Sequence, residues 1–319
     1  MSDRSRFLRR RLKTGIALAL LAAAAWPFSA RADWREDIGT FRVGILAEPG
    51  AGNTVAGLGR LTDAYSRALG MKVEFFVARD YGALVEAQLA GRIQYAVYSA
   101  LAYAAARHRC GCVEPLVAPT DGDGAVGVRS VLIARQGRLA GPSDIASRKV
   151  ALGPADSVTG SLLPLAELAG IASGGTPGGL SPNAADLLRA SSASAAEAML
   201  ADGQADAIFG WQPAAREDGP DLPGGTVARL EAAGIAAADL KVVWRSRLLR
   251  YGPHAVLKSL DPETRRRLSV FLVNLKAQSP EIYDLLEGRH AGGFAAVSAQ
   301  DYRLAEDLLV RIPDEAERQ

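Results

Sequence analysis

Short apolar runs alternate with longer amphipathic segments in the first part of the chain after residue 40. Three apolar runs are expected to be buried strands: residues 41–46, 72–77 and 95–98. Three segments with apolar side chains at helical spacing follow these runs: residues 54–69, 80–89 and 99–107. This alternation with short connections predicts a mostly parallel sheet that is covered by helices on both faces.

The remainder of the chain repeats the pattern after an interruption. Residues 108–127 are rich in glycine and proline and are expected to be irregular, as are residues 217–226. Further strands are expected at residues 128–134, 149–152, 187–189, 205–209, 240–245 and 254–257. Further helices are expected at residues 162–168, 194–200, 261–277, 280–286 and 298–310. The fold class is therefore α/β.

The order of these elements predicts two lobes joined by a two-strand hinge, because the chain leaves one α/β group and later returns to it. Residues 33–135 and 243–319 are assigned to lobe 1, and residues 136–242 to lobe 2. In this architecture ligands bind in a cleft, at the carboxyl ends of strands and the N-termini of helices.

One strand-to-helix turn carries the densest set of polar groups for such a ligand. Residues 149–152 form the expected strand, and Ser157, Val158, Thr159 and Gly160 lead into the following helix. Backbone N–H groups in a first helical turn lack intrahelical partners, and together with the hydroxyls they suit a small oxyanion. The alternative is that Ser157 or Thr159 is an ordinary helix N-cap.

Four other residues are expected at the same cleft, because each lies where a predicted strand ends. They are Tyr81, Tyr98, Ser99 and Trp211. The aromatic rings would wall the cleft and exclude water. Ordinary core packing is the alternative for each ring.

The first 32 residues have the features of an export signal. A basic start precedes an apolar stretch at residues 15–25, which is too short to span a bilayer comfortably, and Ala30-Arg31-Ala32 fits signal peptidase. We expect cleavage after Ala32 and a periplasmic location, by the Sec or the twin-arginine route. An uncleaved anchor is the alternative.

Export changes the charge of the chain. The leader holds seven of the 37 basic residues and one of the 35 acidic residues, so 30 basic and 34 acidic residues remain, a net charge of −4. Nucleic acid is therefore not an expected partner, since binding it requires a basic surface.

Catalytic and metal chemistry find little support in the sequence. Cys110 and Cys112 flank one glycine, and we expect a structural role for them, bridged or not. Three histidines, His108, His254 and His290, form no recognisable nucleophile, metal or acid–base pattern. We expect no catalytic residue, no metal and no cofactor.

The chain resembles the periplasmic phosphate, phosphite and phosphonate-binding proteins of ABC importers. The similarity covers residues 41–286 and is carried most specifically by the hydroxyl-rich turn at residues 156–164. Supporting segments are residues 42–46, 80–82, 98–103, 203–207 and 242–246. The resemblance implies a two-lobe type II periplasmic-binding-protein fold, with Tyr81 and Tyr98 facing the ligand.

Several positions depart from the family pattern. Asp156 and Val158 stand where the family has asparagine and threonine, so one hydroxyl is lost while the Val158 N–H remains. Ala193 stands where the family has a histidine, and Gly252 falls near an acidic residue that holds a ligand amino group in some members. An aminoalkyl phosphonate is therefore disfavoured, although His254 or Arg250 could substitute nearby.

These observations favour a monomeric solute-binding protein that captures a small oxyanion for a membrane permease. A periplasmic protein that senses its ligand and reports to a membrane receptor is the alternative. A hydrolase or transferase is less favoured. The identities of the oxyanion and of the permease are not determined by the sequence.

Overall fold

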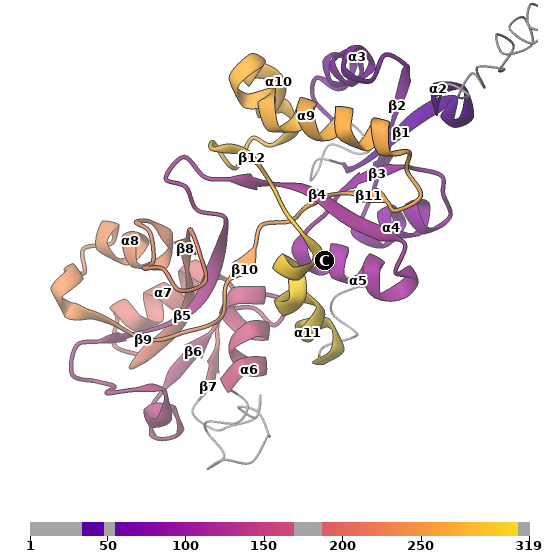
Figure 1. Cartoon of the computed structure of the whole chain (residues 1–319). Helices are drawn as coiled ribbons and strands as arrows, with labels where there is room; N and C mark the ends of the chain where they lie inside the picture. The colour runs from indigo at the N-terminus through magenta and orange to yellow at the C-terminus, as the bar shows by residue number, and fades with distance from the viewer. Residues whose placement is uncertain (1–33, 48–54, 169–186, 312–319) are drawn as a thin grey trace, which may run out of the picture. The chain divides into compact units, whose positions relative to one another are not determined.

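The computed structural model describes residues 34–47, 55–168 and 187–311 (Figure 1). The chain divides into two compact units. Helix α2 (Trp34–Ile38) belongs to the unit made of residues 1–38. The unit of residues 39–319 contains every other described helix and strand, in two mixed sheets. The predicted α/β class is confirmed.

The first sheet has the strand order β12-β4-β11-β3-β1-β2. Its strands are β1 (Thr40–Leu46), β2 (Lys72–Ala78), β3 (Tyr95–Val97), β4 (Val113–Thr120), β11 (His254–Leu257) and β12 (Gly293–Ala296). Strand β1 pairs in parallel with β2 and β3, whereas β11 pairs antiparallel with β3 and β4. The carboxyl ends of β1, β2, β3 and β4 therefore meet at one edge of this sheet.

Helices pack on the first sheet, and those that follow the parallel strands β1, β2 and β3 begin on the side of its carboxyl edge. The helices of this sheet are α3 (Leu58–Leu69), α4 (Tyr81–Leu89), α5 (Ala100–Cys110), α9 (Pro262–Gln278), α10 (Pro280–Leu286), η5 (Ala299–Tyr302) and α11 (Arg303–Arg311). The Asp80 carboxylate accepts from Ala83 N at 2.7 Å to start α4. The Ser99 hydroxyl accepts from Ala102 N at 3.1 Å to start α5. Both caps satisfy first-turn N–H groups and fix where the helices begin.

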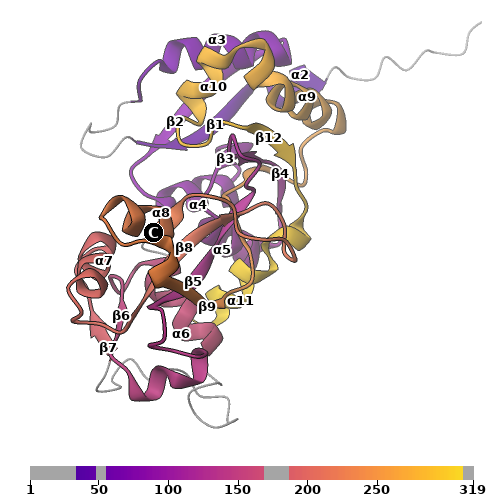
Figure 2. The same cartoon turned by 90° about the vertical axis from the view of Figure 1, so that its left-hand side faces the viewer.

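The second sheet has the order β10-β5-β8-β6-β7, with β9 also paired to β5. Its strands are β5 (Gly127–Arg135), β6 (Val150–Leu152), β7 (Leu187–Arg189), β8 (Ala207–Ala214), β9 (Leu240–Arg245) and β10 (Leu249–Arg250). Its helices are η1 (Pro142–Ser147), η2 (Val158–Leu162), α6 (Leu163–Glu167), α7 (Ala193–Ala201), α8 (Gly225–Ala232) and η4 (Ala237–Asp239). Helices α7 and α8 cover one face, and α6 and η1 lie on the other (Figures 1 and 2).

Strands β4, β10 and β12 and helices α2, α8 and η4 were not predicted from the sequence pattern. Strand β4 lies in residues expected to be irregular. Two prolines in β4, Pro115 and Pro119, hide the strand signal, because proline removes a ladder donor. The sheet accommodates Pro115 through a register shift between His254 and Ala255 of the paired strand β11.

The chain passes between the sheets at two places. Strand β5 pairs with β8, and β9 pairs with β5, so both belong to the second sheet. By strand pairing, the chain enters the second sheet before Gly127 and leaves it after Arg250. The lobe boundaries drawn from the sequence, after residue 135 and before residue 243, stay a prediction.

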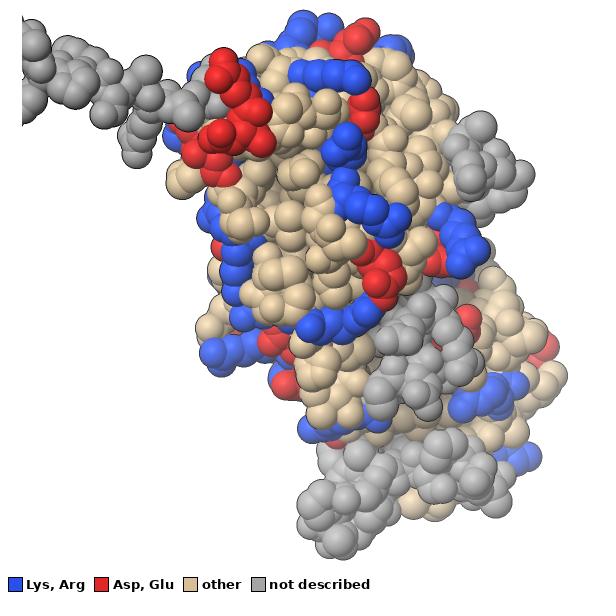
Figure 3. Space-filling model, turned by 90° about the vertical axis from the view of Figure 1, so that its right-hand side faces the viewer, with Lys and Arg blue, Asp and Glu red and all other residues tan. Residues whose placement is uncertain are grey.

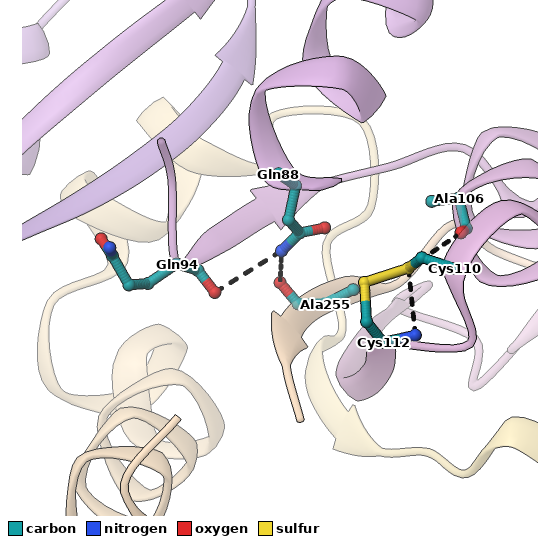
Figure 4. Close-up of a disulfide and its surroundings, with 6 residues drawn as sticks. All are labelled: Gln88, Gln94, Ala106, Cys110, Cys112 and Ala255. Carbon is teal, nitrogen blue, oxygen red and sulfur yellow. Dashed lines mark hydrogen bonds between the residues drawn. A yellow bond between two sulfur atoms is a disulfide. The ribbon is translucent and has the colours of Figure 1, made fainter. Parts of the chain in front are cut away.

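Cys110 and Cys112 form a disulfide at the end of α5 (Figure 4). Gly111 between them adopts a left-handed conformation with φ of 59°, which ends the helix. Nearby, the buried Gln88 side chain donates to the carbonyl oxygens of Gln94 and Ala255. The bridge therefore closes a helix C-terminus and joins no distant elements.

No helix in the three described ranges is both long enough and apolar enough to cross a bilayer.

Candidate functional site

The turn between β6 and η2 is folded tightly by its own polar groups. Gly153 N donates to Gly160 O at 2.9 Å, and Ser161 Oγ donates to Gly153 O at 2.9 Å. A Cβ on Gly160 would lie 2.8 Å from Ser157 Oγ and 3.2 Å from Gly153 Cα. Position 160 therefore requires glycine for the two backbone segments to approach.

Ser157 is the N-cap of η2, so it has the capping role that the sequence analysis gave as the alternative to ligand binding. Its hydroxyl oxygen accepts from Gly160 N at 3.1 Å. Val158 and Thr159 open the helical segment, and within the described residues their N–H groups donate to no backbone or side-chain acceptor. Capping leaves the Ser157 hydroxyl proton free to donate. The turn thus offers two N–H groups and two hydroxyls to an anion.

The second sheet holds the turn through Ser130 of β5, and Trp211 of β8 lies on the same face of that sheet. Ser130 Oγ donates to Thr159 O at 2.6 Å. Ser130 is paired with Trp211 across β5 and β8, so both side chains lie on the sheet face that η2 contacts. Trp211 is half-buried, and its ring centroid lies 5.4 Å from the guanidinium carbon of Arg229.

Tyr81, Tyr98 and Val158 converge on one apolar cluster, although they come from different sheets. Tyr98 is a buried member of this cluster, and Tyr81 and Val158 pack against it. Tyr98 is held there by backbone contacts, since its N–H donates to Pro253 O at 3.0 Å. One apolar cluster therefore extends from the turn of the second sheet to residues at the carboxyl edge of the first.

Tyr98 is 3% exposed, and its hydroxyl has no hydrogen-bond partner among the described residues. Buried hydroxyls are nearly always paired, so an orphan one marks a place for a ligand or water. Burial raises the pKa of this phenol, which stays a protonated donor. Burial also raises the pKa of the half-buried Tyr81 phenol, and the Arg289 charge and a hydrogen bond with Ser99 oppose that rise.

A cation that sequence reasoning missed lies against the turn. Arg189 Nη1 lies 3.4 Å from Gly153 O and 3.3 Å from Ser161 Oγ. Arg189 ends β7, the parallel neighbour of β6, so its position follows from the strand order. The sequence pattern predicted a strand at residues 187–189, and the position of Arg189 at the end of that strand could have identified it as a site residue. The charge of Arg189 favours an anion at this turn.

His254 lies away from these groups, in the core of the first sheet. Its Nδ1 is hydrogen-bonded to the Tyr95 hydroxyl, which also contacts the Tyr65 hydroxyl at 3.0 Å. Burial lowers the pKa of His254 to about 3, so the ring is neutral. The ring is fully buried and its Nε2 has no hydrogen-bond partner among the described residues, so the suggested substitution by His254 stays a prediction.

No constellation for catalysis or metal binding is found in the described ranges. None of the hydrogen bonds there joins a histidine to Ser157. No group of three or more His, Cys, Asp or Glu side chains is placed to hold a metal ion in the same residues.

The geometry agrees with comparisons to known proteins. A profile of the family described as periplasmic substrate-binding proteins of phosphonate ABC transporters matches residues 43–302. The phosphate-import protein PhnD of Mycolicibacterium smegmatis is 28% identical over 246 residues, which is 73% of each chain.

The chain is similar to solved structures, and the first of the following two shares its fold. XAC2383 from Xanthomonas citri with bound chloride has a TM-score of 0.55 and 18% identity, over 87% of this chain and 98% of that one. A binding-protein component of an ABC phosphonate transporter from Pseudomonas aeruginosa has a TM-score of 0.47 and 20% identity, over 86% and 87%.

Two sheets joined by two chain crossings agree with the architecture of periplasmic solute-binding proteins. The chain belongs to the family of periplasmic substrate-binding proteins of phosphonate ABC transporters. Its function is that of a transport component that binds solute, and the sensing alternative is not favoured.

Proposed function

We propose that this protein binds a phosphorus oxyanion of the phosphonate, phosphite or phosphate class at the turn of residues 157–160. The main support for this proposal is that the backbone N–H groups of Val158 and Thr159 have no acceptor among the described residues. Ser157 and Thr159 supply hydroxyl donors, and Arg189 adds a positive charge beside the turn. Hydrogen bonds to a charged oxygen are stronger than neutral ones, so few contacts suffice.

Tyr81, Tyr98, Ser99 and Trp211 complete the proposed site. The orphan hydroxyl of Tyr98 is the best placed of these to donate to an anion oxygen. Ser99 accepts from Ala102 N and is hydrogen-bonded to Tyr81, so these two side chains lie side by side. Trp211 and Tyr81 contribute ring surface that excludes water, which strengthens the polar contacts.

The bound anion would then be delivered to an ABC permease in the membrane. We also propose that residues 1–32 direct export and are removed after Ala32, and that the protein acts as a monomer. The negative charge of residues 33–319 argues against nucleic acid as a partner. On the face in Figure 3, basic and acidic side chains are interspersed.

A thermal-shift screen of residues 33–319 tests the proposal. The probes are phosphate, phosphite, methylphosphonate, aminoethylphosphonate, sulfate and small carboxylates. At least one phosphorus oxyanion should raise the melting temperature, and isothermal titration calorimetry should give its stoichiometry as one. If only sulfate or a carboxylate gives a shift, the phosphorus class is wrong.

A further inference from the structure

The disulfide between Cys110 and Cys112 has no part in the proposed anion site. Cys110 ends α5, and Cys112 directly precedes β4. Cys110 is exposed and Cys112 is half-buried. A Cβ built on Gly111, which lies between them, would meet no described atom within 4 Å, so this side of the turn is open. A thiol of another molecule can therefore approach the bridge.

Backbone hydrogen bonds hold both ends of this turn without the help of the bridge. Gly111 N donates to Arg107 O at 2.7 Å and ends the helix. On the other side, Lys258 N donates to Cys112 O at 2.8 Å. The Cα atoms of the two cysteines lie 5.0 Å apart, within the usual range for a disulfide. Opening of the S–S bond would therefore leave two thiols held near each other in a folded protein.

The bridge adds little to the stability of the fold, because it joins cysteines only two positions apart in the sequence. The entropy that a disulfide removes from the unfolded chain grows with the length of the loop that it closes, and this loop is very short. The linkage is reciprocal: folding makes the bridge harder to reduce only by as much as the bridge stabilises the fold. The fold therefore protects this bridge weakly, whereas it would strongly protect a bridge between distant elements.

We propose that Cys110 and Cys112 are a redox-active pair that accepts two electrons from a dithiol while the protein stays folded. A thiolate of the dithiol attacks Sγ of Cys110, the more exposed cysteine. The S–S bond breaks, and Cys112 leaves as a thiolate and takes up a proton. The second thiolate of the dithiol then attacks the first sulfur in the mixed disulfide and releases Cys110. The dithiol becomes a disulfide, and both cysteines become thiols.

Two backbone groups are placed to stabilise Cys110 after its release (Figure 4). Cys112 N donates to Cys110 Sγ at 3.0 Å, and a hydrogen bond of this kind favours a thiolate. Cys110 Sγ also lies 3.4 Å from Ala106 O, which can accept the thiol proton once the sulfur is protonated. Both forms of the released sulfur therefore have a partner.

The first test measures how strongly folding protects the bridge. The protein, as residues 33–319, is equilibrated with mixtures of reduced and oxidised glutathione, both folded and in urea, and free thiols are alkylated and counted by mass spectrometry. The equilibrium constant for reduction should be lower in the folded protein by no more than about thirtyfold, since closure of so short a loop accounts for roughly fifteenfold. A larger factor would identify a structural bridge and overturn the proposal.

The second test follows the electrons, with dithiothreitol as the dithiol. Folded protein should oxidise about one equivalent of dithiothreitol, with its near-ultraviolet circular dichroism retained and its melting temperature lowered by only a few degrees. The matched control is the double variant Cys110→Ser, Cys112→Ser, which should oxidise none. Reduction that proceeds only together with loss of the native spectrum would contradict a redox-active pair.

Trapping of the mixed disulfide tests which sulfur is attacked. Folded protein is treated briefly with reduced glutathione and acidified, and fragmentation mass spectrometry should place the glutathione on Cys110. Glutathione found on Cys112 would overturn the assigned order of attack. None of these measurements involves an oxyanion, so their failure would leave the proposed function as it stands.

Discussion

The side chain of Val158 is apolar and does not provide the hydroxyl that the family has at this position. Its side chain packs against the apolar cluster that contains Tyr98 and Leu163. A hydroxyl there would lose contact with water without an assured partner, which is unfavourable by about 1–3 kcal/mol. The loss of a family hydroxyl at this position is therefore explained by the apolar surroundings of the side chain, while the backbone N–H remains free.

Val158→Thr is expected to lower stability without improving binding. The free energy of unfolding should fall by about 1 kcal/mol or more, because a hydroxyl enters an apolar contact. Thermal denaturation measures this change, and calorimetry with methylphosphonate should give a dissociation constant within about twofold of the original. Clearly tighter binding would show instead that the new hydroxyl reaches the anion.

Replacing both Ser157 and Thr159 with alanine should abolish the stabilisation by a phosphorus oxyanion. Ser157 also caps η2, so the ligand-free protein should lose about 1 kcal/mol of stability. Melting temperatures with and without phosphate or methylphosphonate separate the two effects. Ser192→Ala, which removes the N-cap of α7, is the control for a pure capping loss. A double variant that is still stabilised by the same anion would place the site elsewhere.

The stability of the protein should depend on pH through His254. Burial lowers its folded-state pKa to about 3, from about 6.5 in the unfolded chain. Below pH 6.5 the unfolded chain therefore binds a proton that the folded protein does not. Stability should fall as the pH drops from 6.5 toward 3, by a few kcal/mol.

His254→Asn should flatten this pH dependence, because asparagine does not titrate and its amide can reach the Tyr95 hydroxyl. Melting curves between pH 8 and pH 4 measure the slopes. His108→Asn, at an exposed position of α5, should leave the slope as it was. Equal slopes for the original protein and the His254 variant would contradict a buried neutral imidazole.

At the scale of elements, the close approach of two loops decides where Tyr98 lies. Gly252 precedes β11, and a Cβ there would lie 1.9 Å from Tyr98 O and 2.8 Å from Ser99 Cα. Both are backbone atoms, which cannot rotate aside. The start of α5 and the orphan hydroxyl of Tyr98 are therefore positioned by a glycine far away in sequence.

Gly252→Ala should displace the Tyr98–Ser99 backbone and weaken both stability and anion binding. Gly59→Ala is the contrasting variant, since a Cβ at Gly59 meets nothing within 4 Å in helix α3. Alanine there should raise stability by up to about 1 kcal/mol. Chemical denaturation and calorimetry measure both variants. A Gly252 variant as stable as the original would mean that the loops separate easily.

At the same scale, strands and helices with a regular hydrophobic period were predictable from the sequence. Elements whose hydrophobic pattern is interrupted were not. The apolar runs of β1 and β2 and the caps of α4 and α9 are local signals. Strand β4 was hidden because its prolines disrupt the pattern, and it forms because β11 and β12 pair on either side. Pairing across the sheet overrides local preference at such positions.

At the scale of the whole molecule, several contacts join elements of the two sheets. The Arg247 guanidinium pairs with Glu167 of α6 and with Asp307 of α11, each at 2.9 Å. Glu217 accepts from Leu248 N at 3.0 Å, close to the second crossing. Ion pairs with exposed partners contribute little stability, so these pairs alone would not hold the two sheets in one arrangement.

Binding of the proposed anion should therefore be accompanied by closure. Small-angle X-ray scattering should show a smaller radius of gyration in saturating methylphosphonate than without it. The double alanine variant at positions 157 and 159 should show no such change. An unchanged radius on saturation of the original protein would mean that the site is preformed.

The sequence by itself determined the α/β class and the polar turn at residues 157–160, and it predicts a leader whose removal would leave a negative net charge. These depend on local periodicity, composition and capping chemistry, which act over a few residues. Only the tertiary structure decided that Val158 packs on the cluster that contains Tyr98, that Arg189 lies beside the turn, and that His254 is buried. Those facts depend on strand order and on contacts between distant segments, which a local pattern does not encode.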